Sequence, residues 1–327
     1  MQAIVHDVYG PPEVLRLEDR EPPALGEGDL RIDVRATSVT TAEWRMRSAD
    51  YGSGLFALAG RLMFGLFRPR NRTTGREFAG RVTAVGSAVT NFAVGDDVFG
   101  THPGANAEQL VIPASGMVVR MPAGLTHAEA AALPFGSICA LDFLEDRAKV
   151  RPGERVLVVG ASGGVGVYLV QVAKALGAEV TGVCSTANRD LVRRLGADHV
   201  VDYTTTDLRT LPGPFDVIVD TVGQTSFAQF RRMLSPTGRH VFIEGGLGEF
   251  LQSMTSALRS GPRVISGVSA DSREALERVR ARVEQGTLRP VVGHRFAMAD
   301  VVQAHRLVQA RHRRGAVVLE FPAAAHG

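Results

Sequence analysis

The sequence predicts an α/β protein in which a doubly wound parallel sheet is joined to a compact β domain. Its 327 residues exceed what one hydrophobic core usually organises, so two domains are expected. From about Arg155 onward, short β-branched runs alternate with helix-length amphipathic segments, which is the pattern of parallel βαβ units. Before that point, glycine and proline turn signals separate short alternating runs, as in a twisted β domain.

The parallel part contains candidate strands for one sheet of about six strands. They are expected at Arg155–Val159, Glu179–Cys184, His199–Val201, Asp216–Asp220, Arg239–Ile243 and Val264–Val268. The first connecting helix begins near Gly164, and its apolar residues recur at helical spacing up to a stop at Gly177.

The β domain is predicted to be discontinuous in sequence. Its strands are expected at Leu30–Ala36, Phe78–Val85, Gly293–Phe296 and Gly315–Phe321. The last two follow a helix at Ser272–Gln285 and have no partner in the doubly wound sheet, so they should return to the β domain. The predicted division is therefore 1–122 with 270–327 for the β domain, and 123–269 for the domain with the parallel sheet.

Composition limits the partners. A hydrophobic fraction of 45% and a charged fraction of 22% fit a soluble globular protein. The net charge of +3 comes from 37 basic and 34 acidic residues spread along the chain, so no nucleic-acid partner is expected. The exception to this spread is a local basic cluster of Arg68, Arg70, Arg72 and Arg76.

The cysteines and the most apolar segment indicate a cytoplasmic protein. Cys139 and Cys184 are far apart in apolar surroundings, which argues against a disulfide framework. The segment Gly54–Phe67 is too short to span a bilayer and contains Arg61. No membrane partner is therefore expected.

The stretch VLVVGASGGVG, Val156–Gly166, has two interpretations. As G-x-S-x-G it would be a hydrolase elbow with Ser162 as nucleophile, and Asp220 and His305 could complete a triad. As Ala161-x-Gly163-x-x-Gly166 it is a dinucleotide fingerprint with alanine at its first position.

Position favours the fingerprint, because an elbow normally follows several earlier βα units and this turn follows the first strand of its sheet. Backbone amides in the turn and at the helix start would then hold a pyrophosphate. The expected contacts are Ser162, Gly163, Gly164, Val165 and Gly166.

The end of the second strand favours NADPH over NADH. It reads Val183-Cys184-Ser185-Thr186-Ala187-Asn188-Arg189, without the acid that usually holds the ribose hydroxyls of NAD. The hydroxyls of Ser185 and Thr186 and the cation of Arg189 suit a 2′-phosphate. The alternative is that Arg189 faces solvent at a helix start.

Four stretches together carry a family resemblance: Gly75–Gly100, Ala128–Leu141, Val150–Gly166 and Leu195–Tyr203. Over nearly its full length the chain resembles the zinc-independent quinone oxidoreductase branch of the medium-chain dehydrogenase/reductase (MDR) superfamily. The resemblance implies a GroES-like β domain, a Rossmann domain with a six-stranded parallel sheet, an active site in the cleft between them, and a homodimer paired through the last Rossmann strand.

The resemblance also bears on metal. Metal-dependent members hold zinc with an early cysteine, a histidine in a G-H-E segment and a later cysteine or glutamate. Here the first place falls within Ser38–Thr41 and the second segment reads Gly75-Arg76-Glu77, so no metal site is expected. Without zinc, the easier reaction is hydride delivery from a reduced nicotinamide to an electron-poor carbon.

The resemblance assigns the reaction site. Tyr51 would hydrogen-bond the acceptor oxygen, and its alternative is a partly buried loop tyrosine. Thr40 and Glu43 stand where relatives carry asparagine and aspartate as catalytic-site residues. Cys139 replaces a threonine beside the nicotinamide, or is a core cysteine.

Further residues are assigned to the cofactor and the acceptor. Tyr203 and Arg311 match positions near the adenosine 2′-phosphate. The ribose and nicotinamide contacts are Val222, Gly223, Phe242, Ile243, Glu244 and Gly245. In the insert at 52–72, a roof over a hydrophobic acceptor or a dimer interface would explain Leu55, Phe56, Leu62, Met63, Phe64 and Phe67.

The sequence therefore predicts an NADPH-dependent reductase of quinones or α,β-unsaturated carbonyl compounds, with small, hydrophobic, electron-poor substrates. One alternative is an enoyl-thioester reductase of the fatty-acid or polyketide type. Another is a non-catalytic NADPH-binding sensor or accessory protein.

Overall fold

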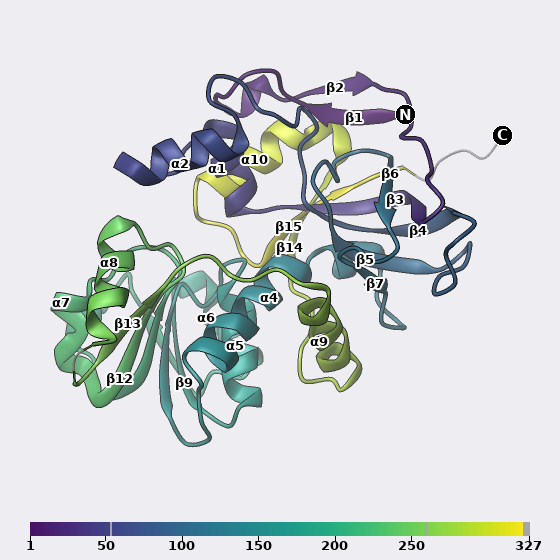
Figure 1. The fold of residues 1–327 in the computed structure, drawn as a ribbon. Coiled ribbons are helices and arrows are strands. Elements are labelled where there is room, and N and C mark those ends of the chain that lie inside the picture. Colours follow the sequence, from purple (N-terminus) through teal and green to yellow (C-terminus); the bar gives the residue numbers. More distant parts are fainter. Residues whose placement is uncertain (53, 259, 323–327) are drawn as a thin grey trace. The chain divides into compact units, whose positions relative to one another are not determined.

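The structure is a computed structural model that describes residues 1–52, 54–258 and 260–322. The chain forms two compact units, residues 1–135 with 272–327 and residues 136–271 (Figure 1). The sequence-based division put residues 123–135 in the second unit. The structure places them in the first, because helix α3 (His127–Ala131) packs on strands β3 (Asp29–Val39) and β4 (Glu77–Val85).

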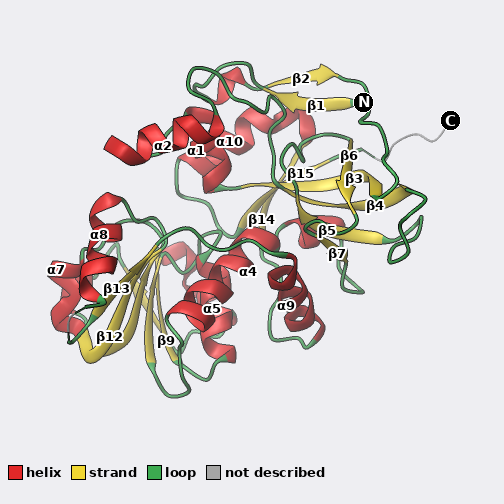
Figure 2. Cartoon of the chain, viewed as in Figure 1, coloured by secondary structure: helices red, strands yellow, loops and turns green. Residues whose placement is uncertain are grey.

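The second unit is a doubly wound sheet, as predicted. Among the described residues, six parallel strands follow the order β10-β9-β8-β11-β12-β13, with α5 on one side and α7 and α8 on the other (Figure 2). The strands are β8 (Arg155–Val159), β9 (Glu179–Cys184), β10 (His199–Asp202), β11 (Phe215–Asp220), β12 (Leu234–Phe242) and β13 (Arg263–Ser266). The helices are α4 (Pro134–Leu141), α5 (Gly166–Ala175), α6 (Arg189–Arg194), α7 (Phe227–Phe230) and α8 (Leu247–Ser256).

The sequence signals place these elements closely. The β8 residues Val156 to Val159 are all buried, as expected for a parallel strand covered on both faces. Helix α5 begins two residues later than predicted, because Gly163 and Gly164 still belong to the turn before it. It ends before Gly177, which has the left-handed φ of +81° that favours glycine at a helix stop.

The first unit is built on a sheet with the path β14-β15-β3-β4-β5-β7, to which β6 is added through β3. Its remaining strands are β1 (Gln2–Val5), β2 (Arg16–Asp19), β5 (Asp97–Thr101), β6 (Gln109–Pro113), β7 (Val118–Arg120), β14 (Val292–Ala297) and β15 (Ala316–Glu320). Its other helices are α1 (Thr41–Ser48), α2 (Gly54–Phe64), α9 (Arg273–Glu284) and α10 (Val301–Gln309).

The C-terminal strands return to this sheet, as predicted. Strand β15 pairs antiparallel with β3, so that Val318 lies opposite Ser38. The buried core between the sheet and its helices includes Leu30, Ile32, Phe78, Val98, Val301 and Val317. None of the helices that the structure describes combines the length and the apolar character of a transmembrane span.

Candidate functional site

The turn after β8 has a backbone that only glycine allows. Gly160 has a φ of +84°, and a Cβ on Gly166 would overlap the carbonyl oxygen of Gly160. The Gly163 N–H donates to that same carbonyl at 3.0 Å, which closes the turn. The chain can therefore begin α5 directly against the sheet, as the fingerprint predicts.

The start of α5 offers unused hydrogen-bond donors. Val165 occupies the N-cap position, and no side chain caps the helix. Among the residues that the structure describes, the N–H groups of Gly164 and Val165 make no hydrogen bond. Free amides at the positive end of a helix dipole fit the oxygens of a pyrophosphate.

Ser162 does not have the surroundings of a nucleophile. Its side chain is buried, and its Oγ accepts a hydrogen bond from Asn188 Nδ2 at 3.1 Å. The same amide donates to Ser185 Oγ at 3.3 Å, so Asn188 links the turn to the end of β9. Sequence analysis missed Asn188, because an asparagine in a loop carries no signal of its distant partner.

The end of β9 brings together the residues predicted to hold a 2′-phosphate. Ser185 and Thr186 follow the strand, and Arg189 opens α6. The Nε of Arg189 is buried without a hydrogen-bond partner in the described part of the chain. A buried guanidinium N–H of this kind suits an anionic oxygen.

One acid near this place was not foreseen. Asp202, at the end of the neighbouring strand β10, accepts a hydrogen bond from Thr186 Oγ1 at 2.5 Å. It also accepts from the N–H and hydroxyl of Thr204, at 2.9 and 2.6 Å. The bond from Thr186 and then those from Thr204 hold the pKa of Asp202 below its usual value. The carboxylate is thus already used to order this loop.

The residues assigned by resemblance to the 2′-phosphate lie in different units. Tyr203 follows β10, is half exposed, and donates its backbone N–H to Cys184 at 3.2 Å. Arg311, in the first unit, lies over the ring of Trp44 at 6.0 Å.

The turn after β11, with Val222 and Gly223, is held by Asp220. One carboxylate oxygen accepts from the N–H groups of both turn residues, at 2.8 and 2.9 Å. The other accepts from the N–H and hydroxyl of Thr225, each at 2.7 Å. Both oxygens of Asp220 are thus engaged within the turn, which argues against a part in a hydrolase triad.

A buried histidine lies behind this turn. Thr225 Oγ1 is 2.9 Å from His240 Nε2, and the His240 ring is 4.1 Å from that of Phe242. Burial lowers the pKa of His240 to about 3, so it stays neutral. The assigned residues Ile243, Glu244 and Gly245 follow β12, where the Ile243 N–H donates to the Asp220 carbonyl at 3.0 Å.

Cys139 has the properties of a core cysteine. It lies in α4 and is buried, and burial raises the pKa of its thiol. The Cys139 side chain therefore acts as a small apolar group on the buried side of α4.

In the first unit, Thr40 and Glu43 take part in hydrogen bonds at the start of α1. Thr40 is the N-cap of α1, and its Oγ1 accepts from the Glu43 N–H at 3.2 Å. Glu43 is buried and accepts from Asn106 Nδ2 at 2.7 Å, with His305 Nε2 at 3.6 Å.

The hydroxyl of Tyr51, the sequence-predicted donor, lies near both Met46 and Tyr9. The Tyr51 ring stacks on Phe64 with centroids 5.4 Å apart, and a Cβ on Gly60 would overlap it. The hydroxyl donates to the Met46 carbonyl at 3.4 Å, which is long for a hydrogen bond. Partial burial, and then Tyr9, raise the pKa of Tyr51, so the proton is retained.

The places that hold zinc in metal-dependent relatives are filled differently. Ser38 Oγ and the backbone N–H of Phe135 both donate to the carboxylate of Glu77, which is buried. Glu77 thereby holds the start of α4. Within the described ranges, no three His, Cys, Asp or Glu residues are grouped so that they could bind a metal ion.

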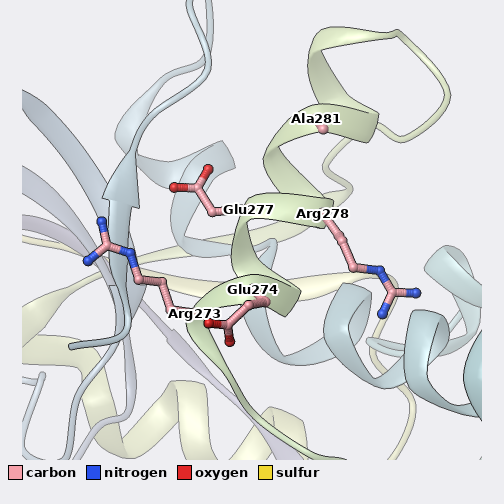
Figure 3. A pocket seen from close by; sticks show the side chains of 5 residues that line it. All are labelled: Arg273, Glu274, Glu277, Arg278 and Ala281. Carbon is pink, nitrogen blue, oxygen red and sulfur yellow. The ribbon is translucent and has the colours of Figure 1, made fainter. Parts of the chain in front are cut away.

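A shallow hollow of about 430 Å³ lies along α9 and is not part of this chemistry. Its lining side chains point in different directions (Figure 3). The guanidinium of Arg273 donates to the carbonyl of Ala114 at 2.7 Å, and Glu277 pairs with Arg280 at 3.1 Å. Among the described lining residues, no group of polar atoms points toward one common position.

The parallel sheet, the glycine turn and the returning β domain define a dinucleotide-binding oxidoreductase of two units. The sequence matches the alcohol dehydrogenase GroES-like domain over residues 26–130 and the zinc-binding dehydrogenase family over residues 195–319. A quinone oxidoreductase of Pseudomonas aeruginosa is 31% identical, with 95% of this chain and 97% of that protein covered. The human mitochondrial NAD(P)H oxidoreductase RTN4IP1 is 31% identical, with 98% and 89% covered.

Solved structures of other proteins are similar to this chain over nearly its whole length. The quinone oxidoreductase of Coxiella burnetii has a TM-score of 0.84 at 29% identity, covering 98% of this chain and 99% of its own. The CurK enoyl reductase has a TM-score of 0.85 at 25% identity and covers 98% and 99%. Mycobacterial Rv1454c, complexed with NADPH, has a TM-score of 0.78 at 27% identity and covers 98% and 100%. The chain belongs to the quinone oxidoreductase branch of the MDR superfamily, which confirms the resemblance and the fold class.

Proposed function

We propose that this oxidoreductase uses NADPH to reduce quinones or α,β-unsaturated carbonyl compounds and that it needs no zinc. The observation that carries the proposal is the turn at Gly160–Gly166, which combines a backbone shaped for close approach with the unused N–H groups of Gly164 and Val165. A nicotinamide cofactor is supported by relatives named as NAD(P)H oxidoreductases and by the NADPH complex of Rv1454c.

The preference for NADPH rests on the end of β9. Ser185 and Arg189 supply a hydroxyl and a cation there, and the Nε of Arg189 is buried without a partner among the described residues. Asp202, at the end of the neighbouring strand β10, already accepts hydrogen bonds from Thr186 and Thr204. A 2′-phosphate would supply the acceptor that Arg189 lacks.

Tyr51 is the residue that we assign to the acceptor. When bound, the reduced nicotinamide supplies a hydride to an electron-poor carbon. Tyr51 keeps its proton because burial raises its pKa, and its present bond to Met46 is long. Its hydroxyl is therefore able to turn to an acceptor oxygen and donate a hydrogen bond as negative charge develops.

Independence from zinc is supported by the residues themselves. Ser38 donates its hydroxyl proton to Glu77, and the place of the histidine is taken by Arg76, which cannot ligate a cation.

An enoyl-thioester reductase is the second candidate. It is favoured by the similarity to the CurK enoyl reductase and by 35% identity to the pikromycin polyketide synthase component PikAII, of which 8% is covered. A non-catalytic NADPH-binding protein and a homodimer paired through the edge strand β13 also stay predictions.

The test is NADPH consumption with a panel of small quinones, enones and enoyl thioesters, repeated with NADH and with a chelator. We expect turnover of quinones or enones that prefers NADPH and survives chelation. Turnover of enoyl thioesters alone would establish the second candidate. Saturable binding without turnover would make the chain a sensor or accessory protein, and loss of activity on chelation would disprove zinc independence.

A further inference from the structure

Helix α2 leaves a row of bulky apolar side chains uncovered. Leu62 is 54% exposed, Met63 is 62% exposed, and Phe67, just beyond the helix, is 84% exposed. We define the α2 surface as the exposed apolar residues Leu58, Leu62, Met63, Leu66 and Phe67. Large aliphatic and aromatic groups rarely gather in the open without a binding role.

The opposite face of the helix is fixed to the first unit. The Tyr51 ring packs on Gly60 and stacks on Phe64. Tyr9 donates its hydroxyl proton to the Gly65 carbonyl at 2.7 Å. Gly60, Phe64 and Gly65 make this attachment, whereas the bulky residues of the α2 surface are exposed.

The chain around this surface is strongly basic. Residues 51–76 contain five arginines and no aspartate or glutamate. Arg72 is paired with Asp7 and Glu18, whereas the guanidinium groups of Arg68 and Arg70 are exposed and make no hydrogen bond or ion pair within the described ranges.

These two arginines are adjacent to the apolar residues. The Arg70 N–H donates to the Phe64 carbonyl at 2.9 Å, so the chain folds back on the end of α2 directly after Phe67. An uncovered apolar face beside unpaired cations has the chemistry of a helix that lies at the surface of an anionic bilayer.

We propose that the α2 surface binds an anionic lipid bilayer, with Met63 and Phe67 in the acyl boundary and Arg68 and Arg70 on the head groups. A second copy fits less well, because a symmetric contact through this surface would bring the same arginines together without an acid in the segment. The sequence-based expectation of no membrane partner considered spanning segments, and a helix that lies on the surface needs no spanning length.

Binding to lipid would have a consequence for the acceptor. At a bilayer surface the enzyme would meet acceptors dissolved in the lipid, such as quinones with long hydrophobic tails. This consequence rests on the proposed function, whereas the binding itself does not.

The test is co-sedimentation of the full chain with vesicles of phosphatidylglycerol and phosphatidylcholine, against vesicles of phosphatidylcholine alone, over a salt series. One double variant, Met63→Ser with Phe67→Ser, removes apolar residues of the α2 surface. The other, Arg68→Ala with Arg70→Ala, removes the two arginines beside it. The matched control is Leu251→Ser with Met254→Ser on α8. These side chains are similarly exposed, at 51% and 59%, but α8 contains no arginine.

We expect binding to the anionic vesicles that weakens with salt. Loss of the two arginines should lower the partition coefficient about 30-fold at low salt, because each basic residue contributes about 1 kcal/mol. Loss of the apolar pair should lower it at least about tenfold, and the α8 control should bind like the wild type. The proposal is overturned if the wild type ignores anionic vesicles at low salt, or if both double variants bind as well as the control. It is also overturned if Met63→Ser with Phe67→Ser leaves vesicle binding unchanged and alters only the oligomeric mass of the protein in solution.

Discussion

The turn after β8 and the segment from Thr40 to Tyr51 were both predicted to serve the reaction, yet they are built in different ways. The turn is set by its own backbone, through the positive φ of Gly160 and the close approach of Gly166. The segment is set by distant side chains, since Glu43 is held by Asn106, 63 residues away, and lies near His305. A backbone requirement is local and visible in sequence, whereas a side-chain partner is not.

The largest expected effect breaks the turn. Gly166→Ala should abolish NADPH binding, because the new Cβ would overlap the Gly160 carbonyl oxygen and force α5 away from the sheet. Isothermal titration with NADPH measures the loss.

Gly163→Ala is the matched control for this turn. A Cβ there would lie 3.3 Å from the same oxygen, which a small shift relieves. This variant should keep measurable affinity, and equal loss in both variants would show that the turn is not the determinant.

The second effect concerns Glu43. Glu43→Ala should lower the free energy of unfolding by about 3 kcal/mol, because the buried Asn106 amide would keep Thr74 as an acceptor but lose the charged one. Urea unfolding measures this change. Glu43→Gln keeps an acceptor of the same size and should recover part of the stability. A stable Glu43→Ala protein that had lost only its turnover would support the catalytic role predicted from sequence.

The third effect tests the role of the Tyr51 hydroxyl. Tyr51→Phe should lower kcat about 100-fold by removing one donor to the developing charge, with NADPH affinity unchanged. Steady-state kinetics and a binding titration give the two numbers. Because burial raises the pKa of Tyr51, kcat should show no loss from its ionisation up to pH 10. Unchanged turnover would mean that Tyr51 is only a packed loop tyrosine.

A fourth, smaller effect tests the side chains behind the Val222–Gly223 turn. Burial lowers the folded-state pKa of His240 to about 3, whereas its pKa in the unfolded chain is about 6.5. Between these two pH values the unfolded chain therefore binds a proton at His240 and the folded chain does not. Stability is therefore unaffected by this group above pH 7 and falls as pH drops, by about 2 kcal/mol at pH 5.

Unfolding curves at pH 7 and pH 5 measure this loss. His240→Gln cannot take up the proton and should show a correspondingly smaller fall. Equal falls in the two proteins would contradict the assignment.

Sequence patterns predicted the fold well because each signal was local. The boundaries of β8 and β9 agree with prediction, and α9 runs between the expected ends, with Ser272 as its N-cap. The return of β15 to β3 followed from the lack of another partner. Helices α1 and α2 and the hairpin β1–β2 were not predicted, since their patterns are short or broken by glycine.

The candidate site was predicted only in part. The glycines were found because φ and close approach leave a mark in the sequence. The roles of Asn188, Asp202 and Asp220 depend on which loops meet at the carboxyl edge of the sheet, and no spacing shows this. The side chains of Leu55 and Phe56, assigned to a roof or an interface, lie outside the described residues.

The most direct test of the central claim is a fluorescence titration of the wild type and Arg189→Ala with NADPH and NADH. The account predicts saturable binding of NADPH, about tenfold tighter than that of NADH, with the difference lost in the variant. A titration with no saturable signal, or one in which NADH binds the wild type as tightly as NADPH, would contradict it.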